Sequence, residues 1–331
     1  MTVHDLKLAP LADELALKPK QRVDAIDCGR GAALVGMALY HLAWDLADFG
    51  FVPPTLPFSP PMRLFSHLVA SAFLALAGAS LALAHPMKTN WKAFWRRIAV
   101  VGGAAAVVST GSFAFAPGQF IWFGILHCIA VSSVLAAPFI QANAAATFVA
   151  GTAAIAAPFF FHSKTFDPPA LLWIGLGDAL PNTLDWRPLL PWGGVLLLGL
   201  SAARFPGTLE RLTSPARWRP RATLTSVLCF AGRHSLPIYL VHQPLLVGLV
   251  AALAHLGLAR SATTPTPTAF LAACQHACEK GRGEADACEM SCRCALDVIE
   301  RSGVADRFNA GALDKVRSAE VRRLVQACIE P

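Results

Sequence analysis

The chain has 331 residues, of which 55% are hydrophobic and only 15% are charged, and its mean hydropathy is +0.49. Soluble domains carry about 25% charged residues, so this composition excludes an ordinary soluble domain and indicates an integral membrane protein. The net charge of +7 does not indicate nucleic-acid binding, because Lys and Arg cluster in short loops between apolar segments, as membrane topology requires.

The N-terminal part of the chain predicts a cytoplasmic tail followed by a series of membrane spans. Residues 1–21 contain no apolar run of signal-peptide length, so we expect no cleavage there. A bilayer core of roughly 30 Å requires about 20 apolar residues per helix. On that measure the chain has seven spans: 28–48, 63–85, 98–116, 119–139, 143–162, 188–205 and 234–257. The predicted fold class is all-α, a polytopic membrane helix bundle of 22–258 with a small cysteine-rich helical C-terminal domain.

The loops between the spans predict the orientation. Two basic loops, KTNWKAFWRR at 88–97 and RFPGTLERLTSPARWRPR at 204–221, fall on one side, and Pro-rich loops poorer in Lys and Arg fall on the other. The positive-inside rule therefore places the N-terminus in the cytoplasm and the C-terminus outside it. The apolar segment 170–177 is too short to span and predicts a re-entrant or interfacial piece. Residues 221–233 are expected to lie flat on the cytoplasmic surface.

A linker at 259–267, rich in Pro and Thr, leads to the polar C-terminal domain 268–331, which holds six of the nine cysteines. Four of them follow the pattern C-x3-C-x9-C-x3-C, which places each pair on one helical face and predicts two helices back to back. In the oxidising compartment that the topology predicts, we favour disulfides over a zinc site. Among the 15 connectivities of six cysteines we choose Cys274 with Cys292 and Cys278 with Cys288. The cysteines in or near the spans are expected to be free thiols: Cys28, Cys128 and Cys229.

Ionisable residues interrupt the first span. His41 lies about 18 Å into this span and Asp45 lies one helical turn further. The spacing of four places both on one face, so the carboxylate can accept a hydrogen bond from the imidazole and fix its tautomer, as in a general base. The alternative is a structural hydrogen bond between helices.

Three further histidines lie at similar depth on other spans: His67, His127 and His242. Four histidines within one band near the bilayer centre suggest a shared polar cavity. Two other functions remain open, since intramembrane histidines also ligate haem b and intramembrane charges also mark the ion routes of channels and transporters.

Four segments together resemble the heparan-alpha-glucosaminide N-acetyltransferase catalytic domain, in particular its short bacterial members. They are RVDAIDCGRGAALVGMALYHLAWDL, LALAGASLAL, FGILHCIAV and GRHSLPIYLVHQPLL, and the resemblance covers about 22–257. Arg30 followed by His41 is also similar to the Arg and His in the first span of membrane acyltransferases that O-acylate sugars. The resemblance implies transfer of an acetyl group from cytoplasmic acetyl-CoA to an amine or hydroxyl of a sugar or glycan on the far side of a bacterial inner membrane.

This implied reaction assigns roles to the polar residues. His41, Asp45, His67 and His127 are the candidate catalytic residues. Coenzyme A phosphates require basic residues at the inner rim, where the candidates, with Lys92 beside them, are Arg30, Arg96, Arg97, Arg233 and His234. His242, deeper in the last span, is a further candidate for binding the donor. Anchoring to anionic lipid is the alternative role of these basic side chains. Acetyl-CoA is expected as a co-substrate, with no permanently bound cofactor and no metal; the lipid bilayer is a partner, and a homodimer is left open.

Overall fold

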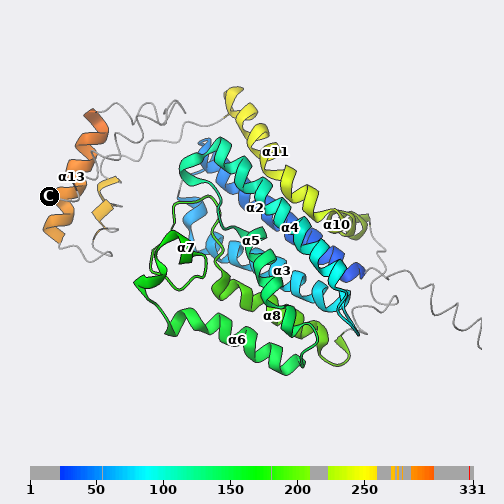
Figure 1. The fold of residues 1–331 in the computed structure, drawn as a ribbon. Helices are drawn as coiled ribbons and strands as arrows, with labels where there is room; N and C mark the ends of the chain where they lie inside the picture. Colours follow the sequence, from blue (N-terminus) through cyan, green and yellow to red (C-terminus); the bar gives the residue numbers. More distant parts are fainter. Residues whose placement is uncertain are drawn as a thin grey trace, which may run out of the picture. The chain divides into compact units, whose positions relative to one another are not determined.

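The structure is a computed structural model that describes residues 23–53, 55–179, 181–208, 223–258, 270–272, 274–275, 278, 285–301 and 328. The predicted N-terminal tail (1–21) and linker (259–267) lie outside these residues, as does much of the predicted C-terminal domain. Every regular element within the described part of the chain is a helix (Figure 1). Together with the disulfides of the C-terminal region, this confirms the predicted fold class.

The helices follow the predicted spans in order. The long ones are α2 (Asp24–Asp48), α3 (Pro60–Ala84), α4 (Trp91–Phe115), α5 (Ile125–Leu135), α6 (Ala144–Phe160), α8 (Leu189–Arg204), α10 (Thr223–Arg233), α11 (Ser235–His255) and α13 (Ala285–Arg301). Short helices in the connections are η1 (Leu56–Phe58), η2 (Pro117–Gln119), η3 (Ala137–Phe139), η4 (Lys164–Phe166) and α7 (Pro169–Leu172).

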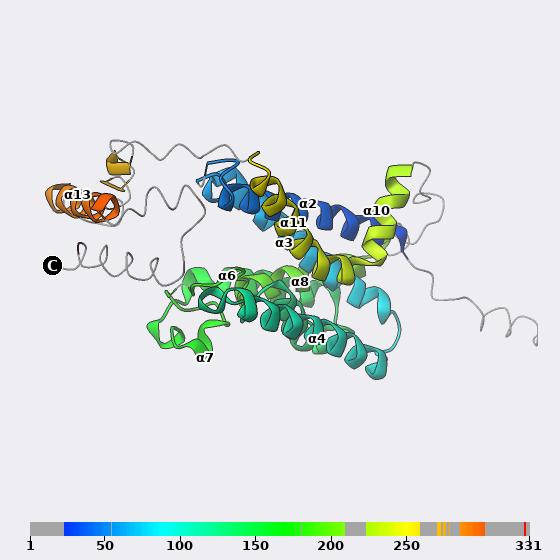
Figure 2. The same ribbon diagram turned by 90° about the horizontal axis from the view of Figure 1, so that it is seen from above.

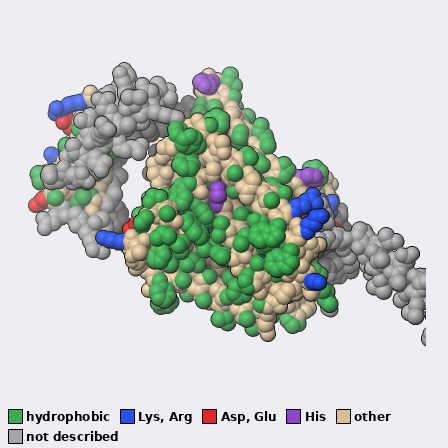
Figure 3. Space-filling view, viewed as in Figure 1, with side chains coloured by type: hydrophobic (Ala, Val, Ile, Leu, Met, Phe, Trp, Pro, Cys, Tyr) green, Lys and Arg blue, Asp and Glu red, His purple; other side chains and the backbone are tan. Residues whose placement is uncertain are grey.

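By length and composition, α3, α4 and α11 are each able to cross a membrane, which supports an integral membrane protein. The helices α5, α6 and α8 are apolar but shorter, and the predicted total of seven spans stays a prediction. Figure 3 agrees with a lipid environment, because hydrophobic side chains cover much of the visible face of the helical bundle and basic side chains gather at one edge. The segment 170–177 is not a span: it contains α7 and two tight turns, and its backbone bonds to Leu189, Leu190 and Ser163.

The chain divides into two compact units, the first comprising Met1–Leu39 and Arg63–Gln243 and the second comprising Tyr40–Met62 and Pro244–Pro331. The core of the first unit is built where α3 crosses α8. A side chain at Gly78 would meet the Leu196 carbonyl of α8, and one at Gly199 would meet the Ala75 carbonyl of α3. Small residues thus allow the two backbones to touch, as is common between membrane helices. Leu74 beside this crossing is fully buried.

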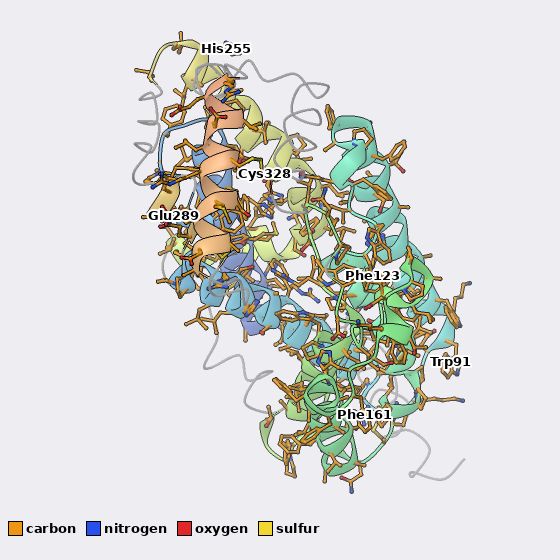
Figure 4. The ribbon with its side chains drawn as sticks, turned by 90° about the vertical axis from the view of Figure 1, so that its left-hand side faces the viewer. Trp91, Phe123, Phe161, His255, Glu289 and Cys328 are labelled. Carbon is orange, nitrogen blue, oxygen red and sulfur yellow. A yellow bond between two sulfur atoms is a disulfide. The ribbon has the colours of Figure 1, made fainter. Side chains whose placement is uncertain are left out.

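Two further contacts complete the first unit. Helix α6 lies alongside α8, as Figures 1 and 2 both show, with Gly151 facing the Gly194 carbonyl. The start of α11 packs Leu236 and Tyr239 against Ala104 and Leu126 of α4 and α5. In Figure 4, Phe123 lies within the bundle, whereas Phe161 lies at its edge, and their exposed fractions are 7% and 68%.

The predicted fourth span, 119–139, is helical only in part. Helix α5 has 11 residues, which span about 16 Å and cover half of a bilayer core. The preceding residues 120–124 are non-helical, because their backbone groups bond to side chains of α4 and to residues 183–187 instead of to one another.

In the second unit, Trp44 of α2 contacts Phe58 of η1 edge-on, with ring centroids 4.9 Å apart. The C-terminal region contains the disulfides Cys274–Cys292 and Cys278–Cys288, which confirms the predicted pairing, and a third one, Cys294–Cys328. Cys328 is marked in Figure 4. Helix α13 buries Cys288 and Cys292 on one face.

The prediction of free thiols at Cys28 and Cys229 is wrong, because these two residues form a disulfide between α2 and α10. Cys128 is free and buried, as predicted. The partners Cys28 and Cys229 are 201 residues apart, so only the crossing of α10 over α2 brings them together. No local pattern in the sequence indicates that crossing.

Candidate functional site

Two arginines from different helices converge on the last turns of α3. Arg30 of α2 donates to Ser80 Oγ (2.6 Å), and Arg97 of α4 donates to the Ala77 carbonyl (2.9 Å). Arg30 is close enough for its positive charge to act on Arg97. Among the described residues, Arg97 forms no ion pair with a carboxylate. Arg97 and Arg30 thus place two guanidinium groups close together, and the positive charge of Arg97 is not offset by a carboxylate of the described residues. Such an arrangement is suited to an anionic ligand.

An open surface cavity of about 470 Å³, which includes Arg97 in its lining, lies along the first turns of α4 and is lined by residues 90–101 of this one segment. Lys92, Arg96 and Arg97 form its basic wall, and Val100 and Val101 line its apolar part. A ligand that carries both phosphate groups and an apolar arm matches this lining.

Arg233 has carboxylate partners on α2, far away in the sequence. It forms an ion pair with Asp24 (2.8 Å) and a longer one with Asp27 (3.5 Å). The hydrogen bond to Asp24 raises the pKa of Arg233, so the guanidinium stays charged. Asp27 also pairs with Arg30 (3.6 Å). The positive charges of Arg30 and Arg233 are therefore matched by the two carboxylates, and the excess positive charge at this edge comes from the cavity residues of α4.

The two remaining predicted donor-site histidines make local contacts. The Nδ1 atom of His234 lies 3.0 Å from the Phe230 carbonyl, and its exposed ring contacts the Phe230 ring in a tilted arrangement, with the ring centroids 4.5 Å apart. The Nδ1 atom of His242 lies 2.6 Å from the Tyr239 carbonyl. Their predicted contacts with coenzyme A stay predictions.

The predicted His41–Asp45 pair lies on α2, one turn apart on one helical face. Asp45 is only 4% exposed, and His41 is half-buried with its ring edge-on to Tyr40. Arg30 precedes His41 by 11 residues, which is about 17 Å along the same helix. The helix therefore carries a cation near one end and a shielded His–Asp pair well along its length.

His127 is held by hydrogen bonds at both ring nitrogens. The Gly124 N–H donates to its Nδ1 (3.2 Å), so Nδ1 is an acceptor and Nε2 carries the proton. Nε2 then donates to Ser109 Oγ (3.2 Å), whose hydroxyl donates to the Ile121 carbonyl. The ring thus supports the non-helical backbone before α5, and a role as a proton acceptor would require one of these bonds to open.

Residues 182–187, which belong to one of the predicted Pro-rich loops, form a strap along the same backbone. Thr183 donates to the Phe120 carbonyl (2.8 Å), and the Leu184 N–H donates to the Gln119 carbonyl (2.9 Å). The Asp185 carboxylate accepts from the first N–H of α5, at Ile125 (2.9 Å). The strap therefore satisfies the non-helical backbone of the predicted fourth span, as lipid surroundings would require.

Arg187, at the end of the strap, lies between α3 and the start of α8. Its guanidinium donates to Ser66 Oγ (2.6 Å) and lies 5.1 Å from the ring centroid of Trp192. The predicted catalytic residue His67, which is exposed, contacts the same indole edge-on at 5.5 Å. In the sequence, only the two charged residues of TLDWR (183–187), Asp185 and Arg187, point to this group of contacts.

The shared cavity of four histidines stays a prediction. His67, His127 and His242 belong to the first unit and His41 to the second. Within the described residues, no group of three or more His, Cys, Asp or Glu side chains could hold a metal ion.

Comparison with known families gives one result. The family model of the heparan-alpha-glucosaminide N-acetyltransferase catalytic domain matches residues 22–244, about two thirds of the chain. Comparisons with curated proteins and with solved structures give no match. The matched segment contains Arg30, the His41–Asp45 pair, the basic cavity and the strap, and on this match the chain belongs to the heparan-alpha-glucosaminide N-acetyltransferase catalytic-domain family.

Proposed function

We propose that this protein transfers the acetyl group of cytoplasmic acetyl-CoA to an amine or hydroxyl of a sugar or glycan on the far side of a bacterial inner membrane. The observation that carries the proposal is the basic cavity at the start of α4, beside the Arg30–Arg97 pair. Family membership supports a membrane acetyltransferase.

The phosphates of the donor bind Arg97 and Arg96, which are planar donors suited to phosphate oxygens, with Lys92 as a point charge. Val100 and Val101 contact the apolar arm. The arm extends into the membrane-spanning part of the protein, where the thioester meets the acceptor.

His41 acts as the general base. It takes a proton from the attacking amine or hydroxyl while the new bond to the acetyl carbon forms and the carbon–sulfur bond breaks, and it returns the proton to the thiolate of coenzyme A. Asp45 fixes the tautomer of the imidazole. A second route passes through an acetylated His41. Incubation with labelled acetyl-CoA in the absence of acceptor distinguishes the two routes, because only the second leaves the labelled acetyl group on the protein.

The test is acetyl-CoA turnover by purified protein offered a panel of amino sugars and glycans. We expect His41→Ala to abolish acetyl transfer with an unchanged unfolding midpoint, and Asp45→Asn to lower kcat at least about tenfold. His255→Ala, which removes an exposed histidine at the end of α11 (Figure 4), is the matched control and should retain activity. Normal turnover by the His41 variant would contradict the mechanism, and no turnover with any acceptor would contradict the proposed reaction. An optical spectrum of the same sample tests the haem alternative.

A further inference from the structure

Three basic side chains lie around Trp192 near the beginning of α3. The guanidinium of Arg187 lies 5.1 Å from the ring centroid of Trp192, and the exposed ring of His67 contacts the same indole edge-on. The charges of Arg187 and Arg63 both act on His67, and Arg63 precedes His67 by one turn of α3. These four residues, called the Trp192 group, all belong to the first compact unit.

The positive charge of the Trp192 group is only partly offset. Among the described residues, no carboxylate forms an ion pair with Arg63, His67 or Arg187. Asp185, two residues before Arg187, instead accepts a hydrogen bond from the first N–H of α5. Arg63 and Arg187 carry two positive charges and Asp185 carries one negative charge, so these three side chains leave a net charge of +1. A ligand with a single negative charge would balance it.

The side chains of the group are placed to donate hydrogen bonds to such a ligand. Arg187 donates to Ser66 Oγ and to the Trp186 carbonyl, which fixes the guanidinium and leaves it further N–H groups. Arg63 and His67 are both exposed, so their N–H groups are accessible from outside the protein. Guanidinium groups are well suited to the oxygens of a phosphate.

Exposed leucines of α3 continue this surface with apolar side chains. Leu64 and Leu68 are each 60% exposed, and their spacing places them on the same face of α3 as Arg63 and His67. Helix α3 is long and apolar enough to cross a membrane, and its 25 residues measure about 37 Å. With a hydrocarbon core of about 30 Å, Arg63 lies near the core boundary and Leu68 lies within the core. A lipid has its charged and apolar parts in this order.

Membrane topology does not account for the arginines of the Trp192 group. They lie at the predicted outer end of α3, where the loops are poorer in Lys and Arg than the predicted cytoplasmic loops. Basic residues retain the cytoplasmic ends of membrane helices, but this rule supplies no reason for Arg63 and Arg187 on the other side. Binding of an anion supplies one.

We propose that the Trp192 group binds the phosphodiester headgroup of an anionic phospholipid, whose acyl chains lie along Leu64 and Leu68. The phosphate oxygens accept hydrogen bonds from Arg63, Arg187 and His67. The site is separate from the donor cavity, because the Ala77 carbonyl that Arg97 contacts lies about 21 Å further along α3. The proposal therefore does not depend on the proposed function.

The experiment measures lipid binding to delipidated full-length protein in detergent by native mass spectrometry. We expect the first phosphatidylglycerol to bind at least about fivefold more tightly than phosphatidylcholine, which has the same phosphodiester but no net charge. Arg63→Ala should weaken the binding of phosphatidylglycerol about fivefold, and Arg63→Ala with Arg187→Ala about thirtyfold. Lys164→Ala is the matched control, because Lys164 is an exposed basic residue of η4 outside the group, and it should bind like the parent protein.

Equal affinities for the two lipids, or an unchanged affinity in Arg63→Ala, would overturn the proposal. The unfolding midpoint of each variant is measured, because Arg187 also bonds to Ser66; Arg63→Ala removes only an exposed side chain and decides the question if the double variant does not fold. Glycerol phosphate, which lacks acyl chains, should not compete at the concentrations of phosphatidylglycerol used, and competition would show a site for free phosphate compounds instead of a lipid. Bound phosphatidylglycerol should also raise the unfolding midpoint of the parent protein.

Discussion

Replacement of Arg97 by alanine tests the donor site most directly. The guanidinium forms part of the cavity wall, and its charge has no carboxylate partner among the described residues. A hydrogen bond to a charged group contributes about 1.5–3 kcal/mol, and each 1.4 kcal/mol changes a binding constant about tenfold. We therefore expect the KM for acetyl-CoA to rise about tenfold to a hundredfold. Because the phosphates lie away from the reacting carbon, kcat should change little.

The assay is release of coenzyme A at varied acetyl-CoA, with binding of coenzyme A measured separately by calorimetry. Arg97→Lys keeps the charge but loses the planar pair of donors, so its KM for acetyl-CoA should lie between those of the parent protein and of Arg97→Ala. Lys88→Ala is the matched control, because Lys88 is an exposed basic residue of the loop just before α4 and does not line the cavity. Arg97 also bonds to the Ala77 carbonyl, so the unfolding midpoint is measured for each variant.

An unchanged KM in a folded Arg97→Ala protein would refute the assignment of this cavity to the donor phosphates. Arg96→Ala provides an independent check, because Arg96 lines the same cavity but is exposed and is not expected to affect folding. A fall in kcat at constant KM would instead assign Arg97 to the chemical step.

Three further predictions concern packing, charge and cysteines. Gly78→Val should lower the free energy of unfolding by about 1–3 kcal/mol, because the new side chain meets the α8 backbone. Gly103→Val places its side chain in open space and should not lower it, so equal unfolding midpoints for the two variants would contradict the α3–α8 crossing. Arg233→Ala should raise the KM for acetyl-CoA less than Arg97→Ala does, because two carboxylates already neutralise Arg233; a larger rise would assign Arg233 to direct phosphate contact. Oxidised, denatured protein should contain one reactive thiol before reduction and nine after it, and three thiols before reduction would restore the original prediction of unpaired Cys28 and Cys229.

The local pattern of apolar residues and cysteines in the sequence was sufficient to predict several parts of this structure. Apolar runs of helical length predicted the order of the helices, because a helix satisfies its own backbone and depends mainly on consecutive residues. The spacing of Cys274, Cys278, Cys288 and Cys292 predicted two helices back to back, since residues four apart share a helical face, and the pairing chosen for these cysteines agrees with the structure. The motifs around Arg30 and His41 indicated the family that the comparison confirms.

The tertiary structure alone decided the contacts between distant segments. The truncation of the fourth span depends on Ser109 and on the strap with Asp185, whose side chains replace the hydrogen bonds of a helix. Hydropathy does not reveal this, because Gln119–Gly124 is as apolar as many spans and its backbone partners lie elsewhere in the chain. Cys28 and Cys229 are paired only because glycines allow α10 and α2 to touch, across 201 residues of sequence. Local periodicity determines which elements form, whereas close packing between those elements decides which side chains meet.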